Sequence, residues 1–348
     1  MGGGWLDASQ MNQPIKTFDS LPQAARVTVP LRSVGEAEPR PVPLVGVIRN
    51  PRSFRNKGLA PEQAAQAEVI TETTLKRKDL FEVLARFASA GIDYLAIDGG
   101  DGTVRDVLTC GASAFGDDWP PLILMPKGKT NALAADLGLP GQWDLDRALE
   151  RANAGSFTRR RTLVVAEAGD PAARVHGFVL GAGVFTRSIS LGQSAHRWGA
   201  FNALAVFVTT FWSLAQAFFA GSANPWRRQT GISLTDERGN PIAGDAEQRY
   251  VMLSSTLENF PMGLKPFGTA HKGLKLAVLD RPGRGSLLRI PAIAFGRQPR
   301  QPERLGYHWL APEGFLMTLE DRFILDGEAF PSGAYRVSQG PELRFVVP

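Results

Sequence analysis

The sequence predicts an α/β domain over residues 43–157, with a parallel sheet and flanking helices, and a β-rich, sandwich-like domain over residues 158–348. Three observations lead to this prediction. Apolar runs alternate with helical patterns up to residue 137, and short strand-like runs separated by Gly and Pro follow residue 156. Residues 1–42 show no apolar period and are expected to form an N-terminal arm. A length of 348 residues suits two domains.

Composition excludes several classes of protein. Hydrophobic residues make up 43% and charged residues 21% of the chain, which excludes a disordered protein. Cys110 is the single cysteine, which excludes a disulfide scaffold and cysteine-based zinc sites. Together with the lack of an apolar leader, it favours a reducing, cytoplasmic interior. The net charge of +5 fits attraction to phosphates or an anionic membrane surface, and we expect no nucleic-acid partner.

Polar loops follow the buried strands of the first domain. The expected strands are 44–48, 94–97 and 122–125, and the expected helices are 78–90 and 132–137. The loops begin at Asn50, Gly99 and Lys127. Because the carboxyl ends of parallel strands share one edge of a sheet, we expect a ligand site where these loops meet.

Short strands dominate the second domain. The expected runs are 161–167, 175–180, 230–235, 250–255, 274–279, 315–319, 322–325 and 344–347. The final strands, near 315–348, are expected to pack back towards the first domain.

One segment interrupts that pattern. No charged residue occurs from Trp198 to Pro225, a length that could span a bilayer, although polar residues dilute it. We expect a helix that packs on the second domain and touches lipid, while a plain core helix and a true span stay open. The candidate lipid-binding residues are Trp198, Phe201, Phe207, Phe211 and Trp212.

The stretch Gly99-Gly100-Asp101-Gly102-Thr103 is the most informative loop. Glycines directly after a buried strand let backbone N–H groups approach phosphate oxygens, and a following helix N-terminus favours the anion. An aspartate here would repel a phosphate unless it holds Mg²⁺ against it. A glycine-rich turn capped by Asp101 is the plain alternative.

Four motifs occur in order along the chain: Asn50-Pro51-Arg52-Ser53, the glycine loop 99–103, Pro126-Lys127-Gly128 with Asn131, and Asp326-Gly327-Glu328. In this order they resemble the diacylglycerol kinase catalytic family, which includes bacterial lipid kinases, sphingosine kinases and ceramide kinases. The resemblance covers residues 43–348. It implies an NAD kinase/diacylglycerol kinase-like α/β domain that binds ATP, a β-rich lipid-binding domain, and a cleft between them.

The resemblance also implies residue roles. Glu328 would be the general base that takes the proton of the lipid hydroxyl, and Asp101 would be catalytic through Mg²⁺ bound with ATP. The implied nucleotide-binding residues are Asn50, Ser53, Thr74, Gly99, Gly100, Asp101, Gly102, Thr103, Lys129, Thr130, Asn131 and Asp326.

This chain departs from the family pattern at several positions. Lys129 stands where the family usually has a nucleotide-facing threonine, and Phe54 stands where it has glycine. Arg105-Asp106 replaces a common Asn-Glu pair. His271-Lys272-Gly273 replaces an Asp-Asp-Gly turn that holds a structural Mg²⁺ in some bacterial members, so we expect no Mg²⁺ there. Lys129 either faces the phosphates or points to solvent while Thr130 takes over the contact.

The expected function is that of an ATP- and Mg²⁺-dependent lipid kinase, located in the cytoplasm and peripheral on the inner membrane face. The acceptor would be the primary hydroxyl of diacylglycerol, or of ceramide or a sphingoid base. An NAD kinase-like enzyme and a non-catalytic lipid-binding homologue remain alternatives, and a homodimer stays open.

Overall fold

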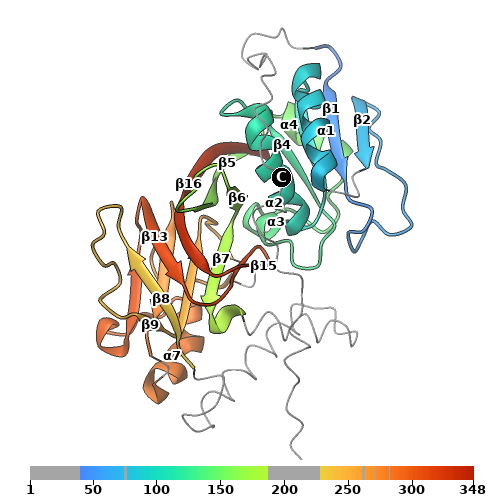
Figure 1. The fold of residues 1–348 in the computed structure, drawn as a ribbon. Helices are drawn as coiled ribbons and strands as arrows, with labels where there is room; N and C mark the ends of the chain where they lie inside the picture. Colours follow the sequence, from blue (N-terminus) through green and yellow to red (C-terminus); the bar gives the residue numbers. More distant parts are fainter. Residues whose placement is uncertain (1–39, 74–76, 187–227, 261–262, 271, 282) are drawn as a thin grey trace, which may run out of the picture.

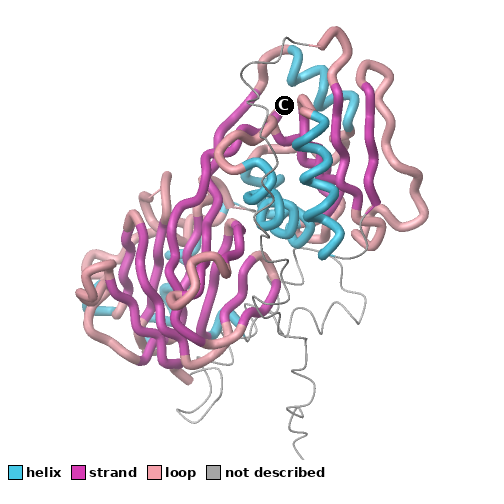
Figure 2. The backbone as a smooth tube through the Cα atoms, turned by 45° about the horizontal axis from the view of Figure 1, so that its top comes forward, coloured by secondary structure: helices cyan, strands magenta, loops and turns pink. Residues whose placement is uncertain are grey.

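The computed structural model describes residues 40–73, 77–186, 228–260, 263–270, 272–281 and 283–348. The expected arm up to residue 39 and the apolar segment Trp198–Pro225 therefore lie outside the described residues. The described chain forms an upper lobe rich in helices and a lower lobe built mainly from strands (Figures 1 and 2). This arrangement confirms the predicted fold class, whereas the proposed boundary near residue 157 remains a prediction.

The N-terminal lobe is a parallel sheet covered by helices. Its strands run in the order β2 (Glu68–Thr73), β1 (Leu44–Arg49), β3 (Tyr94–Gly99) and β4 (Leu122–Pro126). Its helices are α1 (Arg77–Ala90), α2 (Asp101–Phe115), α3 (Ala132–Asp136) and α4 (Leu145–Asn153).

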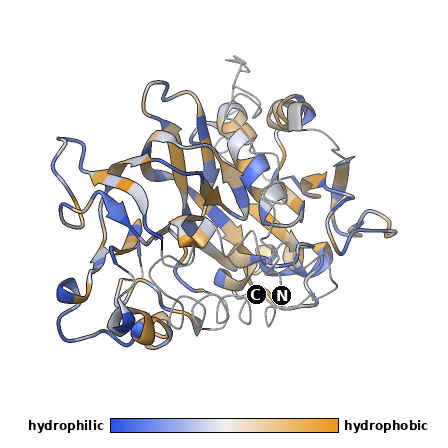
Figure 3. Cartoon of the chain, turned by 60° about the horizontal axis from the view of Figure 1, so that its bottom comes forward, coloured by the Kyte–Doolittle hydropathy of each residue, from blue (hydrophilic) through white to orange (hydrophobic). Residues whose placement is uncertain are grey.

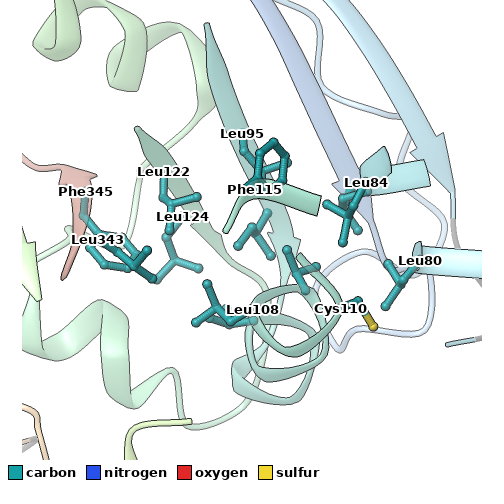
Figure 4. Packing of buried hydrophobic residues seen from close by; sticks show 14 of the residues in the cluster. Leu80, Leu84, Leu95, Leu108, Cys110, Phe115, Leu122, Leu124, Leu343 and Phe345 are labelled. Carbon is teal, nitrogen blue, oxygen red and sulfur yellow. The ribbon is translucent and has the colours of Figure 1, made fainter. Parts of the chain in front are cut away.

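Apolar periodicity explains how these elements pack. Every residue of β1 is buried, as expected for a strand covered on both faces. Leu80, Leu84 and Phe87 form one buried stripe along α1, and they share a core with α2 and the sheet (Figure 4). A second core around Trp143 lies between α4 and the sheet.

The C-terminal lobe contains two packed sheets. One is six-stranded, in the order β12-β11-β10-β7-β14-β15. The other belongs to the sheet that continues from the N-terminal lobe. Side chains of both sheets form one core, which includes Leu163, Leu276 and Phe323. The strands are β5 (Phe157–Glu167), β6 (Arg174–Gly177), β7 (Val179–Gly183), β8 (Thr230–Thr235), β9 (Gln248–Arg249), β10 (Val251–Ser255), β11 (Lys275–Leu279), β12 (Tyr307–Leu310), β13 (Gly314–Leu319), β14 (Phe323–Leu325), β15 (Glu328–Phe330) and β16 (Gly333–Val346).

The last strand joins the two lobes. β16 pairs antiparallel with β5 and β13, and Phe345 pairs parallel with Leu122 of β4. Leu343 and Phe345 lie in the core of the N-terminal lobe, so the chain ends beside α2 and β4 (Figures 1 and 4). The expected strand 344–347 is thus the end of a much longer strand.

Other differences from the predicted elements have local causes. The expected strand 175–180 is divided into β6 and β7 at Phe178. Helix α7 (Arg284–Ala294) was not predicted, because Gly283, Gly285 and Pro291 give this stretch the composition of a loop. Strand β12 was not predicted either. Apolar residues concentrate along the central strands and polar residues along the peripheral loops (Figure 3). None of the described helices is both long and apolar enough to cross a membrane.

Candidate functional site

Three loops meet at the carboxyl edge of the N-terminal sheet, as predicted. The Asn50 side chain at the end of β1 donates a hydrogen bond to the Thr103 hydroxyl after β3, at 2.9 Å. The backbone N–H of Lys127, after β4, donates to the Gly99 carbonyl at 2.8 Å, and the Lys127 carbonyl accepts from Arg55 N–H at 3.0 Å. These bonds fix the loops against one another.

Asn56, Asp98 and Arg49 form a buried polar network that supports these loops. The Asn56 amide donates to Asp98 Oδ1 at 2.9 Å and to the Asn50 carbonyl at 3.0 Å. Arg49 Nη1 lies 3.4 Å from Asp98 Oδ2. Burial raises the pKa of Asp98, while Asn56, Lys127 and Arg49 counteract that rise. Sequence reasoning missed Asn56 and Asp98, because neither belongs to the four motifs.

The glycines allow the loops to touch backbone to backbone. A Cβ atom on Gly100 would lie 2.8 Å from Gly128 Cα, and one on Gly99 would lie 2.5 Å from the Thr103 side chain. Asn131 adopts a left-handed conformation with φ 51° and closes its own loop, accepting from Gly128 N–H at 2.8 Å and donating to the Gly128 carbonyl at 3.0 Å. Side chains would separate these loops, so glycine is required there.

Asp101 begins α2, and its carboxylate faces the backbone N–H groups of Asn131, Ala132 and Leu133 at the start of the neighbouring helix α3. Burial raises the pKa of Asp101, while these three N–H groups and Arg105 favour its charged form. The sequence did not predict this contact. Mg²⁺ at Asp101 stays a prediction.

Asp326 and Gly327 form the tight turn between β14 and β15. Their φ angles of 46° and 80° are those of a type I′ hairpin turn, for which Asp-Gly is favoured. The Asp326 carboxylate accepts the backbone N–H groups of Phe178 at 3.1 Å and Val179 at 2.9 Å. It shares a small cavity with Asp101. Burial, and then the charge of Asp101, raises the pKa of Asp326 to about 7.

Glu328 follows this turn and reaches back to the first lobe. Its Oε2 lies 2.7 Å from Arg105 Nη2, and its Oε1 lies 4.0 Å from where a Cβ on Gly102 would be. The glycine loop and the Asp326-Gly327-Glu328 motif, more than two hundred residues apart in sequence, therefore meet in space. The Glu328 side chain keeps 28% of its surface exposed, so the carboxylate remains open to a substrate.

Arg105 is the residue that connects the two lobes at this point. Its side chain is fully buried and also pairs with Asp106 at 2.8 Å and donates to the Leu325 carbonyl at 3.4 Å. Burial alone would lower the pKa of Arg105, but Asp106 and Glu328 hold it above its ordinary value. From the sequence, Arg105 was identified only as a departure from the family pattern, and no role was assigned to it.

Lys129 and Phe54, two further departures, lie together. Both residues are exposed, and Lys129 Nζ lies 5.9 Å from the centre of the Phe54 ring. Thr130 is also exposed, whereas Ser53 is buried and its backbone N–H donates to the Asn50 carbonyl at 3.1 Å. The side chains of Lys129 and Thr130 are thus both accessible beside the glycine loop.

Several predicted site residues lie outside the described residues. They are Thr74, the lipid-binding set Trp198, Phe201, Phe207, Phe211 and Trp212, and His271. Near His271, the buried Lys275 ammonium donates to the Gly273 carbonyl at 3.1 Å. Within the described ranges, no cluster of three or more His, Cys, Asp or Glu side chains could hold a metal ion.

Comparison with known protein families matches residues 45–165 to the diacylglycerol kinase catalytic domain. The resemblance predicted from the motifs is therefore confirmed for this part of the chain. Among curated proteins, the "Probable lipid kinase YegS" of Escherichia coli O127:H6 and that of Shigella flexneri are each 34% identical over 83 residues. That segment is 24% of this chain and 27% of either relative, so the match spans about a quarter of their length.

Solved structures share the fold over most of the chain. A protein from Bacillus anthracis str. Sterne, named a "putative diacylglycerol kinase", has a TM-score of 0.62 at 14% identity. The match covers 89% of this chain and 99% of that protein. A second structure of a protein with this name has a TM-score of 0.60 at 15% identity. At such low identity these likenesses establish the two-lobed architecture alone.

Proposed function

On the premise that residues 45–165 are a diacylglycerol kinase catalytic domain, we propose that this protein is an ATP-dependent lipid kinase. It transfers the terminal phosphoryl group of ATP to the primary hydroxyl of a membrane lipid, which is diacylglycerol or else ceramide or a sphingoid base. The observation that carries the proposal is the position of Glu328. A partly exposed carboxylate from the second lobe lies against the glycine loop of the first, 2.7 Å from Arg105.

The loops around Gly99–Gly102 fit a nucleotide phosphate. Gly100 precedes α2, and its carbonyl accepts the N–H groups of Thr103 and Val104 in the first turn. The bare glycine backbone and the helix N-terminus can receive an anion without a steric barrier. Asn50 and Thr103 are held ready beside them by their mutual hydrogen bond. The exposed Lys129 ammonium supplies positive charge next to the same loop.

Bound Mg²⁺–ATP would supply the electrophilic phosphorus and the charge neutralisation that phosphoryl transfer requires. Asp101 is the candidate residue for the metal. Three backbone N–H groups of residues 131–133 face its carboxylate and favour the charged form that a metal ion would need.

Glu328 acts in this proposal as the general base. An alcohol is a poor nucleophile until a carboxylate accepts its proton during transfer. Oε2 pairs with the Arg105 guanidinium, and Oε1 lies on the side of Gly102, where it would accept the hydroxyl proton. Arg105 is a positioning residue, because it fixes the orientation of Glu328 without needing to touch either substrate.

The test is phosphate transfer from labelled ATP to a panel of acceptors presented in detergent micelles. The panel holds diacylglycerol, ceramide, sphingosine and NAD, assayed with and without Mg²⁺. Label in a lipid product, and its loss in Glu328→Gln, is the expected result. Label in NAD alone would identify an NAD kinase-like enzyme. Lipid binding without transfer to any acceptor would identify a non-catalytic homologue.

A further inference from the structure

Helix α7 exposes large apolar side chains on the surface of the C-terminal lobe. Leu288 is 65% exposed and Phe295, directly after the helix, is 53% exposed. They are the most exposed large hydrophobic residues among those that the structure describes in this lobe. Leu288, Pro291 and Phe295 recur at helical spacing and are all exposed, so they follow one face of the helix.

The fold does not need these side chains for its core. The opposite face of α7 buries Leu287 and Ile293 in a cluster with Tyr250 and Tyr307. The Tyr307 hydroxyl donates to the Ser286 carbonyl at 2.7 Å, which anchors the helix to β12. The helix is thus firmly attached through one face while the other presents apolar groups to its surroundings.

Positive charge surrounds the exposed face. Residues 281–302 contain no aspartate or glutamate, and their arginines are Arg281, Arg284, Arg289, Arg297 and Arg300, all exposed. Within the described chain, none of these guanidinium groups makes an ion pair with a carboxylate. Arginines beside exposed Leu and Phe complement an anionic interface whose interior is apolar.

The described chain is interrupted at the end of the sheet at which α7 lies. Gly183, Val251 and Leu279 are paired neighbours at this end, and α7 follows Leu279. The described chain stops at Thr186, bonded to the Gly183 carbonyl, and by Gln229 it is bonded to the Asp280 carbonyl at 2.8 Å. The described residues on both sides of the gap from 187 to 227 therefore lie at the end of the sheet that carries α7.

We propose that the exposed face of α7, formed by Leu288 and Phe295 with their flanking arginines, docks on an anionic lipid bilayer. This inference rests on the proposed function in one respect, because a lipid kinase meets its acceptor at the surface of a bilayer. The catalytic hairpin pairs through Leu325 with Leu180, towards the opposite end of β7. Docking through α7 therefore places the membrane at the end of the six-stranded sheet away from Glu328.

The first experiment measures partition of the full chain onto phosphatidylcholine vesicles with and without phosphatidylglycerol. Wild type binds the anionic vesicles, and added salt weakens binding. Leu288→Ser with Phe295→Ser, and separately Arg284→Gln with Arg289→Gln, each lower the partition coefficient about tenfold. The matched controls Ile70→Ser and Arg174→Gln, an exposed apolar and an exposed basic residue elsewhere, leave it unchanged. Wild-type binding by both α7 variants would overturn the proposal.

A second measurement shows whether residue 288 enters the bilayer. Cys110 is buried and is the only cysteine, so Leu288→Cys provides a single accessible thiol for an environment-sensitive dye. The dye emission shifts to the blue with anionic vesicles, and the same dye at Ile70→Cys does not shift. A dye at 288 that is already shifted without vesicles would mean that another part of this chain or a second copy covers α7, which would overturn the proposal.

Activity separates this inference from the proposed function. The α7 variants should phosphorylate lipid in detergent micelles at the wild-type rate, because α7 lies at the other end of the sheet from Glu328. A wild type without kinase activity whose vesicle binding is still lost in the α7 variants would refute the proposed function and leave the docking face standing.

Discussion

Two ion-pair clusters join the lobes, and they differ in where their carboxylates lie and how exposed these are. In the Arg105 cluster, Arg105 of α2 holds Glu328 of the second lobe at 2.7 Å. In the Asp136 cluster, Asp136 of α3 accepts Arg160 of β5 at 2.7 Å and the Asn259 backbone N–H at 2.5 Å. The Asp136 side chain has no exposed surface, whereas Glu328 keeps 28%. The same chemistry fastens the lobes in both places, but Glu328 is the partly exposed carboxylate that lies against the glycine loop.

Removing the accessible carboxylate should have the largest effect on activity. Glu328→Gln keeps the shape but cannot accept a proton, so turnover should fall about 10²-fold or more. Glu258→Gln is the matched control, since Glu258 also pairs with a buried arginine and is 33% exposed. Steady-state kinetics should show near wild-type turnover for this control. Equal losses in both variants would mean that the effect at Glu328 is structural.

The Asp136 cluster should respond in stability rather than in turnover. Asp136→Asn removes the charge that compensates Arg160 and so should lower the free energy of unfolding by about 3 kcal/mol. Burial lowers the pKa of the nearby Lys275 to about 8 while Asp136 counteracts this, so Lys275 should also lose its proton more easily in the variant. Urea denaturation measures the first effect. Turnover per folded molecule should stay close to wild type. A specific loss of turnover would contradict a purely structural role for the Asp136 cluster.

Asp326, which adjoins the Arg105 cluster, should make the stability of the folded protein depend on pH. Its pKa is about 7 in the folded chain, above the ordinary 3.8, so the folded state binds this proton more tightly than the unfolded state. The stabilisation is complete below pH 3.8 and is lost as pH rises through about 7. Asp326→Asn keeps a residue suited to the turn and removes the titration.

The measurement is denaturant unfolding from pH 4 to 8. The free energy of unfolding of Asp326→Asn, relative to that of wild type, should increase as pH rises. Asp321→Asn, at an exposed turn, is the control and should follow the wild-type profile. A difference between wild type and Asp326→Asn that does not change with pH would refute the shifted pKa.

Lys129 should have the smallest effect, because its ammonium is exposed. If it faces the ATP phosphates, Lys129→Met should raise the KM for ATP about fivefold, and more at low salt than at high salt. Thr130→Ala should change this KM little. The reverse pattern, with Thr130→Ala severe and Lys129→Met silent, would assign the contact to the threonine hydroxyl.

Strands β1, β3 and β4 and the polar loops after them could be predicted because each buried apolar run ends in Gly, Asn or Pro, whereas β2 and α4 were not among the expected elements. The meeting of Glu328 with Gly102 could be expected only through the family resemblance, since nothing local in the sequence links them. The Arg105 contact could not be predicted, because a lone arginine in a helix gives no sign of a partner at residue 328. The bridging role of β16 was underestimated because Gly340 and Pro341, where the register shifts, give the middle of the strand the composition of a turn.

The central claim is that Arg105 acts through Glu328, and a double-mutant cycle on turnover tests it most directly. Arg105→Gln, Glu328→Gln and the double variant are compared with wild type, with turnover counted per folded molecule and Arg105→Lys as the charge-conserving control. The account predicts that Arg105→Gln lowers turnover at least about tenfold in wild type but changes it little once Glu328 is already glutamine. The same fold-loss from Arg105→Gln in both backgrounds would show that the two residues act independently and would contradict the account.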